Sequence, residues 1–385
     1  MRTERKHVLF LIPSLAGGGA ERVTVNLANY WAGKGWRVAI VTLAAVAQDA
    51  FALDPSITLI PLNLTDPNRS IVAKVFRNFK RMMALRKVLF DIQPDVAVAV
   101  MDYPCVTLAL AARGMTGLVA TGSLHTHPPA VPANAIWRRI HSVAYGQLSA
   151  MVALTQETAA WLAANTKARR IEVIPNAVQC PLPDSCPRVE PDAICRPGRK
   201  LLLAAGRLAP EKGFDLLIGA FAGLSERHED WDLAIVGEGA ERQRLELEIS
   251  ARGLGPRIFL PGWAGNMADW YRRAELYAMS SRFEGFPCTL AEAMAHGLPA
   301  VSFDCDTGPR DIIRNGRDGF LAPKEDASAL MAALDRLMGD ADLRQRFGCA
   351  AKEVRDRFSL QRIAQMWEIT FEELLEQHRG AAMAG

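Results

Sequence analysis

The sequence predicts an α/β protein made of two similar, doubly wound domains, and three observations support this fold class. Short apolar runs alternate with segments of helical length along nearly the whole chain of 385 residues. The runs are continuous in Val, Ile, Leu and Ala, which is typical of parallel strands that helices cover on both faces. They fall into two series that open alike, with a proline-rich stretch between them.

The apolar runs are the predicted strands. The first series consists of residues 8–12, 38–43, 96–101, 118–121, 151–154 and 171–174, and the second of residues 201–205, 233–236, 258–260, 276–278 and 300–303. In each series a glycine-containing turn and a helix follow the first strand. This pattern predicts two Rossmann-like domains that face each other across a cleft.

The boundary between the domains is predicted from proline content. Residues 180–198 contain five prolines and almost no periodicity, so they are interpreted as a linker. The expected domains are therefore residues 1–180 and 181–359. A last helix is expected over residues 360–376.

Composition excludes several classes of protein. A net charge of +3 gives no support for nucleic-acid binding, and seven cysteines without regular spacing do not form a disulfide framework. Cys180, Cys186 and Cys195 lack the spacing of a zinc site. No apolar run reaches the roughly 18 residues that span a bilayer. The first run follows basic residues, as in a signal peptide, but it ends at Pro13 and is interpreted as a buried strand. A cytoplasmic protein is expected.

The first loop contains Gly17, Gly18 and Gly19 between a strand and a helix. Glycines there let the backbone approach a ligand, and they expose amide groups beside the positive end of the helix. Neither the dinucleotide-binding nor the Walker pattern is present. The loop is a candidate ligand-binding element, and a turn that packs the helix on the sheet is the alternative.

Two cations follow the first strand of the second series. Arg207 and Lys212 lie on a loop at the carboxyl edge of the predicted sheet, where doubly wound proteins bind their ligands. An arginine fork and a lysine point charge can together hold a diphosphate. A solvated loop with unpaired charges is the alternative.

Two glutamates flank the start of a later helix. Pro287 is placed for the first turn of a helix that runs to His296, so that Thr289 and Leu290 lie at its start, where free amides can meet phosphate. Glu284, with the amides of Gly285 and Phe286, can bind sugar hydroxyls. Glu292 can accept hydrogen bonds from a ribose diol. The apolar context of Glu292 disfavours the alternative of two surface glutamates.

Together these residues resemble the retaining glycosyltransferases of family 4, of the type that builds bacterial cell-envelope polysaccharides. The resemblance rests on Glu284 and Glu292 at their spacing, Arg207 and Lys212 with their glycines, the Gly-Glu-Gly run at 237–239, the loop at 17–21 and the segment 307–313. It covers nearly the whole chain. It implies the GT-B fold, a C-terminal domain that holds a nucleotide sugar, and a last helix that crosses back to the N-terminal domain.

The resemblance also implies roles for single residues. Arg207 and Lys212 would neutralise the leaving diphosphate, Glu292 would bind ribose and Glu284 the transferred sugar. The nucleobase of the nucleotide sugar would lie near Glu238, Arg257 and Ile258. A histidine near the transferred sugar is expected at the end of an N-domain strand, and either His125 or His127 could be this residue; His125 fits the family spacing better.

Asp304 and Asp306 form a DxD pattern, which in the other large glycosyltransferase fold binds a metal ion. Because Arg207, Lys212 and helix N-termini already supply positive charge, a metal is electrostatically redundant. We expect no metal and no other cofactor.

The predicted reaction transfers a hexosyl or N-acetylhexosaminyl group to a glycan or lipid-linked glycan with retention of the anomeric configuration. A UDP-sugar is the expected donor. A sucrose- or starch-type transferase is the main alternative within this class. A nucleotide-sugar epimerase on the same fold and a non-catalytic sugar-nucleotide binding protein are alternatives from other classes.

Residues 74–90 carry six positive charges and no negative one. Phe76, Phe79 and Met83, with Leu85 or Leu89, recur at helical spacing, which predicts a basic amphipathic helix. We expect it to attach the protein to the anionic inner face of the cytoplasmic membrane, where a polyprenyl-linked acceptor would lie. A packed helix whose cations face water is the alternative.

Overall fold

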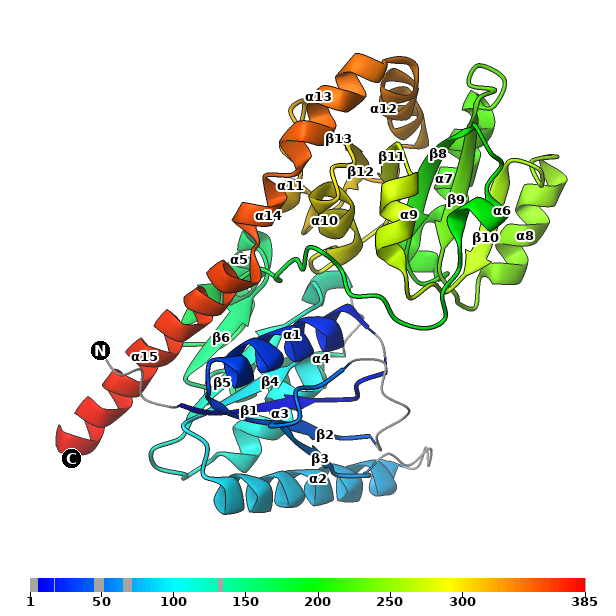
Figure 1. Cartoon of the computed structure of the whole chain (residues 1–385). Helices are drawn as coiled ribbons and strands as arrows, with labels where there is room; N and C mark the ends of the chain where they lie inside the picture. Colours follow the sequence, from blue (N-terminus) through cyan, green and yellow to red (C-terminus); the bar gives the residue numbers. More distant parts are fainter. Residues whose placement is uncertain (1–5, 17, 45–51, 65–70, 131–133, 385) are drawn as a thin grey trace. The chain divides into compact units, whose positions relative to one another are not determined.

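The computed structural model describes residues 6–16, 18–44, 52–64, 71–130 and 134–384. The chain divides into two compact units: Met1–Ala177 together with Leu360–Gly385, and Val178–Ser359. Each unit contains one parallel sheet with helices between its strands (Figure 1). This is the α/β architecture of two Rossmann-like domains that the sequence predicts.

The sheet of the first unit has seven strands, and every neighbouring pair is parallel. In spatial order the strands are β3 (Thr58–Pro61), β2 (Arg37–Thr42), β1 (His7–Ile12), β4 (Val96–Val100), β5 (Val119–Leu124), β6 (Ala150–Ala153) and β7 (Ile171–Val173). The central strands are buried along their length, as their continuous apolar runs predict.

One face of this sheet is covered by a layer of three helices. They are α2 (Ile71–Ile92), α3 (Asp102–Ala111) and α4 (Ala135–Tyr145), and α3 packs against both of the others. Leu85 and Leu89 of α2 join a buried core with Leu9 and Leu11 of β1. The unit also contains the short helix η1 (Pro128–Ala130) and α5 (Gln156–Asn165).

The opposite face of the sheet is covered by α1 (Gly19–Gly33) and α15 (Leu360–Ala384), which pack on each other. Phe10 points to this face because successive strand residues alternate. It stacks on Trp31 of α1, which in turn contacts Phe371 of α15. Trp31 also donates a 3.0 Å hydrogen bond to Glu368. The last helix therefore packs on the N-terminal domain, as predicted, and it is longer than expected (Figure 1).

The sheet of the second unit has six parallel strands: β10 (Ile258–Gly262), β9 (Trp231–Val236), β8 (Lys200–Ala205), β11 (Leu276–Met279), β12 (Ala300–Asp304) and β13 (Gly319–Pro323), in spatial order. Its helices are α6 (Pro191–Ile194), η2 (Pro210–Lys212), α7 (Phe214–Leu224), α8 (Arg242–Ala251), α9 (Met267–Arg273), α10 (Cys288–Ala295), α11 (Pro309–Ile312), α12 (Ala327–Gly339), α13 (Ala341–Ala351) and α14 (Val354–Arg357). Side chains from α7 and α12 form the core with β8 and β9.

Residues 180–198 are not the free linker that their proline content suggests. They belong to the second unit and pack on it: Trp270 of α9 donates a 3.0 Å hydrogen bond to the carbonyl of Val189. The carboxamide of Asn266 accepts from the amide of Val189 at 2.8 Å. Within the described part of the chain, no helix is both long and apolar enough to cross a membrane.

Candidate functional site

The order of strands in the second unit creates a topological switch point at its carboxyl edge. From β8 the chain proceeds through α7 to β9 on one side, whereas β10 returns through α9 to β11 on the other side. The loops after β8 and β11 therefore diverge, and ligands of open α/β sheets bind in the crevice between such loops. Arg207 and Lys212 follow β8, and Glu284 follows β11, so the sequence-predicted cations and carboxylate flank this switch point.

Lys212 and Glu284 are in direct contact across the switch point. Lys212 Nζ lies 2.6 Å from Glu284 Oε1, and the hydroxyl of Ser281 donates to the same oxygen at 2.6 Å. Arg207 is exposed, and its guanidinium has no hydrogen-bond or ion-pair partner among the described residues. The loops at the switch point thus carry one cation held by a carboxylate and a second cation that is exposed.

The two loops are fixed to each other by backbone contacts. The amide of Arg282 donates to the carbonyl of Glu211 at 2.8 Å, and the hydroxyl of Ser280 donates to the carbonyl of Lys212 at 3.0 Å. The guanidinium of Arg282 also pairs with Asp215, with distances of 3.1 and 2.7 Å. These contacts set the position of Lys212 relative to Glu284.

The Gly-Glu-Gly run after β9 approaches the β8 loop closely. A Cβ on Gly237, whose φ is +150°, would lie 1.9 Å from the carbonyl oxygen of Gly206, and one on Gly239 would lie 2.2 Å from that of Leu208. Only glycine permits this approach. Glu238 between them points to Arg242, with Oε1 2.7 Å from Nη2, and this hydrogen bond lowers the pKa of the Glu238 carboxyl.

Helix α10 begins beside Glu284 without a side-chain cap. Its first amides, at Cys288, Thr289 and Leu290, therefore point toward the switch point with the positive end of the helix dipole. Glu292 is only 4% exposed, and it accepts a 3.1 Å hydrogen bond from the hydroxyl of Tyr271.

Four other residues that were predicted to contact the donor lie in or just before this helix. The hydroxyl of Thr289 accepts from Tyr277 at 2.9 Å, and burial raises the pKa of that tyrosine. Leu290 is buried and Phe286 packs on Phe358, so their side chains belong to the core. Gly285 lies between Glu284 and Phe286 in the loop, and the carbonyl of Glu284 accepts from the hydroxyl of Thr307.

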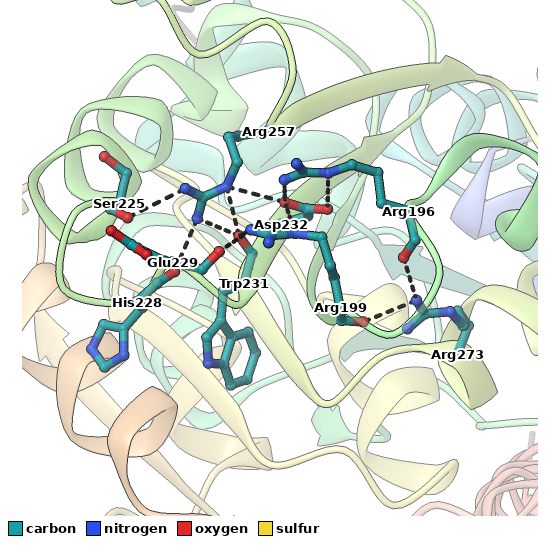
Figure 2. Close-up of polar contacts among 9 residues, drawn as sticks. All are labelled: Arg196, Arg199, Ser225, His228, Glu229, Trp231, Asp232, Arg257 and Arg273. Atoms are coloured by element: carbon teal, nitrogen blue, oxygen red, sulfur yellow. Dashed lines mark hydrogen bonds and ion pairs between the residues drawn. The ribbon is translucent and has the colours of Figure 1, made fainter.

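Arg257 and Ile258 do not lie at this edge. Ile258 begins β10, so it is separated from the carboxyl end at Gly262 by about 13 Å at 3.3 Å per residue. The guanidinium of Arg257 is engaged at the opposite edge, 2.9 Å from the carbonyls of Trp231 and His228 and 3.1 Å from Asp232, as Figure 2 shows. Arg257 and Ile258, which were expected beside the nucleobase together with Glu238, therefore lie at the opposite edge of the sheet from the loop of Glu238.

The residue that does follow β10 at the carboxyl edge is Trp263, which sequence reasoning missed. Its side chain is 41% exposed. The neighbouring residue Gly262 lies close to Glu238, since a Cβ there would be 3.0 Å from the carboxylate. The signal available in the sequence was an aromatic residue directly after a predicted strand.

In the first unit, His125 directly follows β5 and lines a pocket with Ser123, Asn176 and Trp367. Its Nε2 is 3.2 Å from the hydroxyl of Ser123, and its buried Nδ1 has no hydrogen-bond partner among the described residues. Burial lowers the pKa of His125 to about 4, so the imidazole is neutral near pH 7. A neutral ring suits hydrogen bonding to a sugar hydroxyl better than charge stabilisation.

His127 is buried as well, and its Nδ1 lies 3.5 Å from the hydroxyl of Thr158 on α5. The ring of His127 thus contacts α5, whereas His125 lines the pocket.

Of the first glycine loop, Gly17 lies outside the described residues. Gly18 is the N-cap of α1 and Gly19 its first residue. Glu21 is buried in the first turn of the helix, where a carboxylate already meets the positive helix end.

Asp304 and Asp306 point to different cations. Asp304 pairs with Arg310 at 2.9 Å and Asp306 with Lys324 at 2.8 Å. Each carboxylate of the DxD pattern is therefore neutralised by its own partner.

Two α/β units, each with one parallel sheet, form the architecture of the GT-B fold, and the second unit carries a basic loop and a carboxylate loop on either side of its switch point. Comparison with known families agrees. Residues 17–180 match the family described as "Glycosyltransferase Family 4", and residues 192–354 match "Glycosyl transferases group 1". The chain belongs to these glycosyltransferases, and the relatives that it matches over nearly their full length include an amylovoran biosynthesis glycosyltransferase of Erwinia amylovora.

Individual relatives cover the chain to different extents. An exopolysaccharide phosphotransferase of Streptomyces coelicolor is 37% identical over 237 residues, which is 60% of this chain and 24% of that protein. An α-1,4-N-acetyl-D-galactosaminyltransferase of Campylobacter jejuni, named for a PP-undecaprenol-linked acceptor, is 26% identical over 94% of this chain and 96% of its own length. The solved structure of HepE from Anabaena with UDP and glucose has a TM-score of 0.78 at 20% identity, covering 95% and 99% of the two chains.

Proposed function

We propose that the protein transfers a hexose or N-acetylhexosamine from a UDP-sugar to a glycan or lipid-linked glycan, with retention of anomeric configuration. The observation that carries the proposal is the pair of Lys212 and Glu284 across the switch point, beside the exposed Arg207. Cations and a carboxylate at this place match the two halves of a nucleotide sugar: a diphosphate, and a sugar with several hydroxyls.

Different residues bind different parts of the proposed donor. Arg207, Lys212 and the uncapped start of α10 bind the diphosphate, since fork, point charge and helix amides all favour phosphate oxygens. Glu284 accepts hydrogen bonds from the transferred sugar. Glu292, held by Tyr271, accepts from the ribose. The exposed ring of Trp263 provides a surface on which a base can stack.

The chemical step needs little from the protein beyond placement and charge. The bond between the anomeric carbon and the diphosphate oxygen breaks, and the acceptor oxygen forms its bond to the same face of that carbon. The acceptor proton passes to the departing diphosphate. Arg207 and Lys212 stabilise the negative charge that grows on the leaving group.

We further propose that the reaction needs no metal ion. Arg207, Lys212 and the α10 start supply positive charge at the diphosphate. Asp304 and Asp306, the carboxylates that would bind a metal, are each ion-paired to a cation of the protein. A metal would have to displace Arg310 and Lys324 to reach both of them.

Two relatives support the choice of substrates. The Campylobacter enzyme acts on a PP-undecaprenol-linked sugar by its name, and the Anabaena structure contains UDP and glucose. By contrast, an epimerase needs no acceptor, and a sucrose- or starch-type enzyme uses a soluble one.

The proposed acceptor requires access to a membrane, and helix α2 is suited to this. Phe76, Phe79, Met83 and Phe90 are 47–70% exposed on it, interleaved with exposed Lys80 and Lys87. This corrects the expected stripe, because Leu85 and Leu89 face the core instead. We propose that the exposed face of α2 contacts the anionic inner leaflet of the cytoplasmic membrane.

Not every cation of this segment is available to lipid. Arg81 bonds the carbonyl of Leu64 at 2.9 Å, and Arg86 bonds that of Ala111 at 2.7 Å. Both hold α2 to its own unit.

The experiment that tests the reaction incubates the protein with UDP-, GDP- or ADP-sugars, with and without a polyprenyl-diphosphate-linked glycan. Release of UDP that depends on the acceptor, with an anomeric configuration in the product equal to that of the donor by NMR, is expected. An epimer formed from donor alone, transfer to a soluble sugar only, or an inverted product contradicts the proposal. Thermal shift identifies the donor independently, since a ligand at 100 times its Kd stabilises by about 2.7 kcal/mol.

A further inference from the structure

The exposed large apolar side chains of the described residues are unevenly distributed. Most lie on the helix layer of the first unit: Phe76, Phe79, Met83 and Phe90 on α2, Leu110 on α3, and Ile136, Trp137, Ile140 and Val143 on α4. Soluble proteins rarely leave apolar side chains clustered in contact with water without a binding role.

Helix α4 presents its own apolar stripe. Ile136, Ile140 and Val143 follow one another at spacings of four and three residues, which places them on one side of the helix beside Trp137. Their exposed fractions are 72%, 38% and 40%, and that of Trp137 is 38%. The buried side of the helix is formed by Ala144 and Tyr145 near its end.

The charges on α4 are all of one sign. Arg138 and Arg139 are exposed next to the apolar stripe, and the helix contains no Asp or Glu. Together α2, α3 and α4 contain eight Lys or Arg, six in α2 and two in α4, against two Asp. Apolar side chains between basic residues, with a tryptophan among them, match the interface of an anionic bilayer.

Helix α4 follows the strand end that carries His125. Strand β5 ends at Leu124, at the carboxyl edge, and the chain passes His125 before α4 starts at Ala135. Because the connection returns from the carboxyl edge toward the start of β6, the first turns of α4 are nearest the edge that holds His125. Lipid contact there would bring a membrane-anchored sugar to this edge.

We infer that α4 is a second membrane-contacting element, which inserts Ile136, Trp137 and Ile140 into the interfacial region of an anionic bilayer while α2 lies on its surface. The inference rests on the proposed lipid-linked acceptor. It assigns different roles to the two helices: α2 contributes charge, and α4 contributes apolar insertion near the sheet edge that contains His125. Since α3 packs against both, their outer sides belong to one layer.

The test compares three full-length proteins for binding to vesicles of phosphatidylglycerol and phosphatidylethanolamine, by co-sedimentation at low and high salt. They are the unchanged protein, Ile136→Ser with Ile140→Ser, and the control Leu247→Ser, which alters a 66% exposed leucine on α8 in the other unit. The α4 variant is expected to lose about tenfold or more in vesicle partitioning at both salt concentrations, because loss of two apolar side chains does not depend on screening. The control is expected to bind normally.

A second readout uses Trp137 directly. Its fluorescence, obtained as the difference between the protein and Trp137→Phe, is expected to shift to the blue and to be quenched by brominated lipid. Unchanged partitioning of the α4 variant, or absence of this shift, overturns the inference. So does a change of oligomeric state in the α4 variant, which would make a second copy of the chain the occupant.

Donor binding keeps this outcome separate from that of the proposed function. The α4 variant is expected to show the same thermal shift with UDP-sugar as the unchanged protein, which also shows that it folds. If no UDP-sugar stabilises either protein, the proposed function fails while the vesicle result still decides on α4.

Discussion

Lys212 Nζ and Glu284 Oε1 lie 2.6 Å apart although 71 residues separate them in the chain. The contact joins the loops that leave β8 and β11, the two strands at the switch point of the second unit. The carboxylate of Glu284 holds the ammonium group of Lys212 near the proposed diphosphate position before any ligand binds. Donor binding would add a second anion to the same ammonium group.

Replacing Lys212 or Arg207 by alanine is expected to lower kcat by about 10²–10³-fold, since loss of one donor to a developing anion typically has this effect. KM for the donor should change less, because leaving-group charge is greatest in the transition state. Steady-state kinetics at saturating donor measures the split. Arg346→Ala, which removes an exposed arginine of α13, is the matched control. Near-normal turnover of both site variants would refute the assigned role.

Gly237→Ala should destabilise the second unit and raise KM for the donor. The added Cβ would lie 1.9 Å from the carbonyl of Gly206, at a φ of +150° that alanine rarely adopts, so the loop after β9 must move. We expect a loss of about 1–3 kcal/mol in unfolding free energy, measured by urea denaturation. Gly255→Ala has no atom within 4 Å of its Cβ and serves as control. Equal stability of the two variants would contradict the close approach.

His125 should make stability depend on pH in mildly acidic solution. Burial lowers its folded pKa to about 4, below the ordinary value of 6.5, so between these values the unfolded chain binds the proton and the folded chain does not. The free energy of unfolding therefore falls as the pH decreases from 6.5 to 4, by at most about 1.4 kcal/mol per pH unit for one group.

The variant His125→Asn isolates this contribution, because His7 and His141 also have lowered pKa values and remain in place. Denaturation of both proteins at pH 7 and pH 4.5 is expected to give a smaller decrease for the variant. An identical decrease would show that His125 does not titrate as its burial implies.

Activity is expected to persist in EDTA. The double variant Asp304→Asn, Asp306→Asn, which removes the ion pairs of these carboxylates with Arg310 and Lys324, should lose some stability but retain turnover in the presence of chelator. Turnover that EDTA abolishes and Mn²⁺ restores would disprove the proposed metal independence.

The cations of α2 should govern the salt dependence of membrane binding. Lys80→Gln with Lys87→Gln is expected to weaken binding to anionic vesicles at low salt, by about 1 kcal/mol per engaged cation, and to change it little at high salt. Lys167→Gln with Arg169→Gln removes the same charge from exposed residues elsewhere in the first unit. If both pairs weaken binding alike, only net charge matters and α2 has no special part.

The sequence was most informative about the central strands. Their continuous apolar runs locate them, but β3 and β13 were not predicted. Both lie at the edge of a sheet and end at a proline, and each is buried only in part, so neither carries the apolar run of a central strand. An edge strand is specified largely by the neighbour it pairs with.

The location of a candidate site residue could be predicted where it depends on which end of a strand the residue is next to. Lys212 and Glu284 follow strands, and carboxyl ends of parallel strands meet at one edge, so their proximity followed from the pattern. Arg257 precedes its strand and was assigned to the wrong edge. For α2, periodicity showed apolar residues but could not tell which stripe, that of Leu85 or that of Phe76, faces the sheet. Tertiary packing alone makes that choice.

The return of α15 means that the first unit is not encoded by one continuous stretch of the gene. The chain leaves this unit after Ala177 and re-enters it at Leu360. A fragment that stops at Ala177 would leave Trp31, now fully buried, without Phe371 above it. Exchange of the second unit between related transferases therefore requires two splice points, and a separately produced N-terminal unit must have residues 360–384 joined to it by a linker.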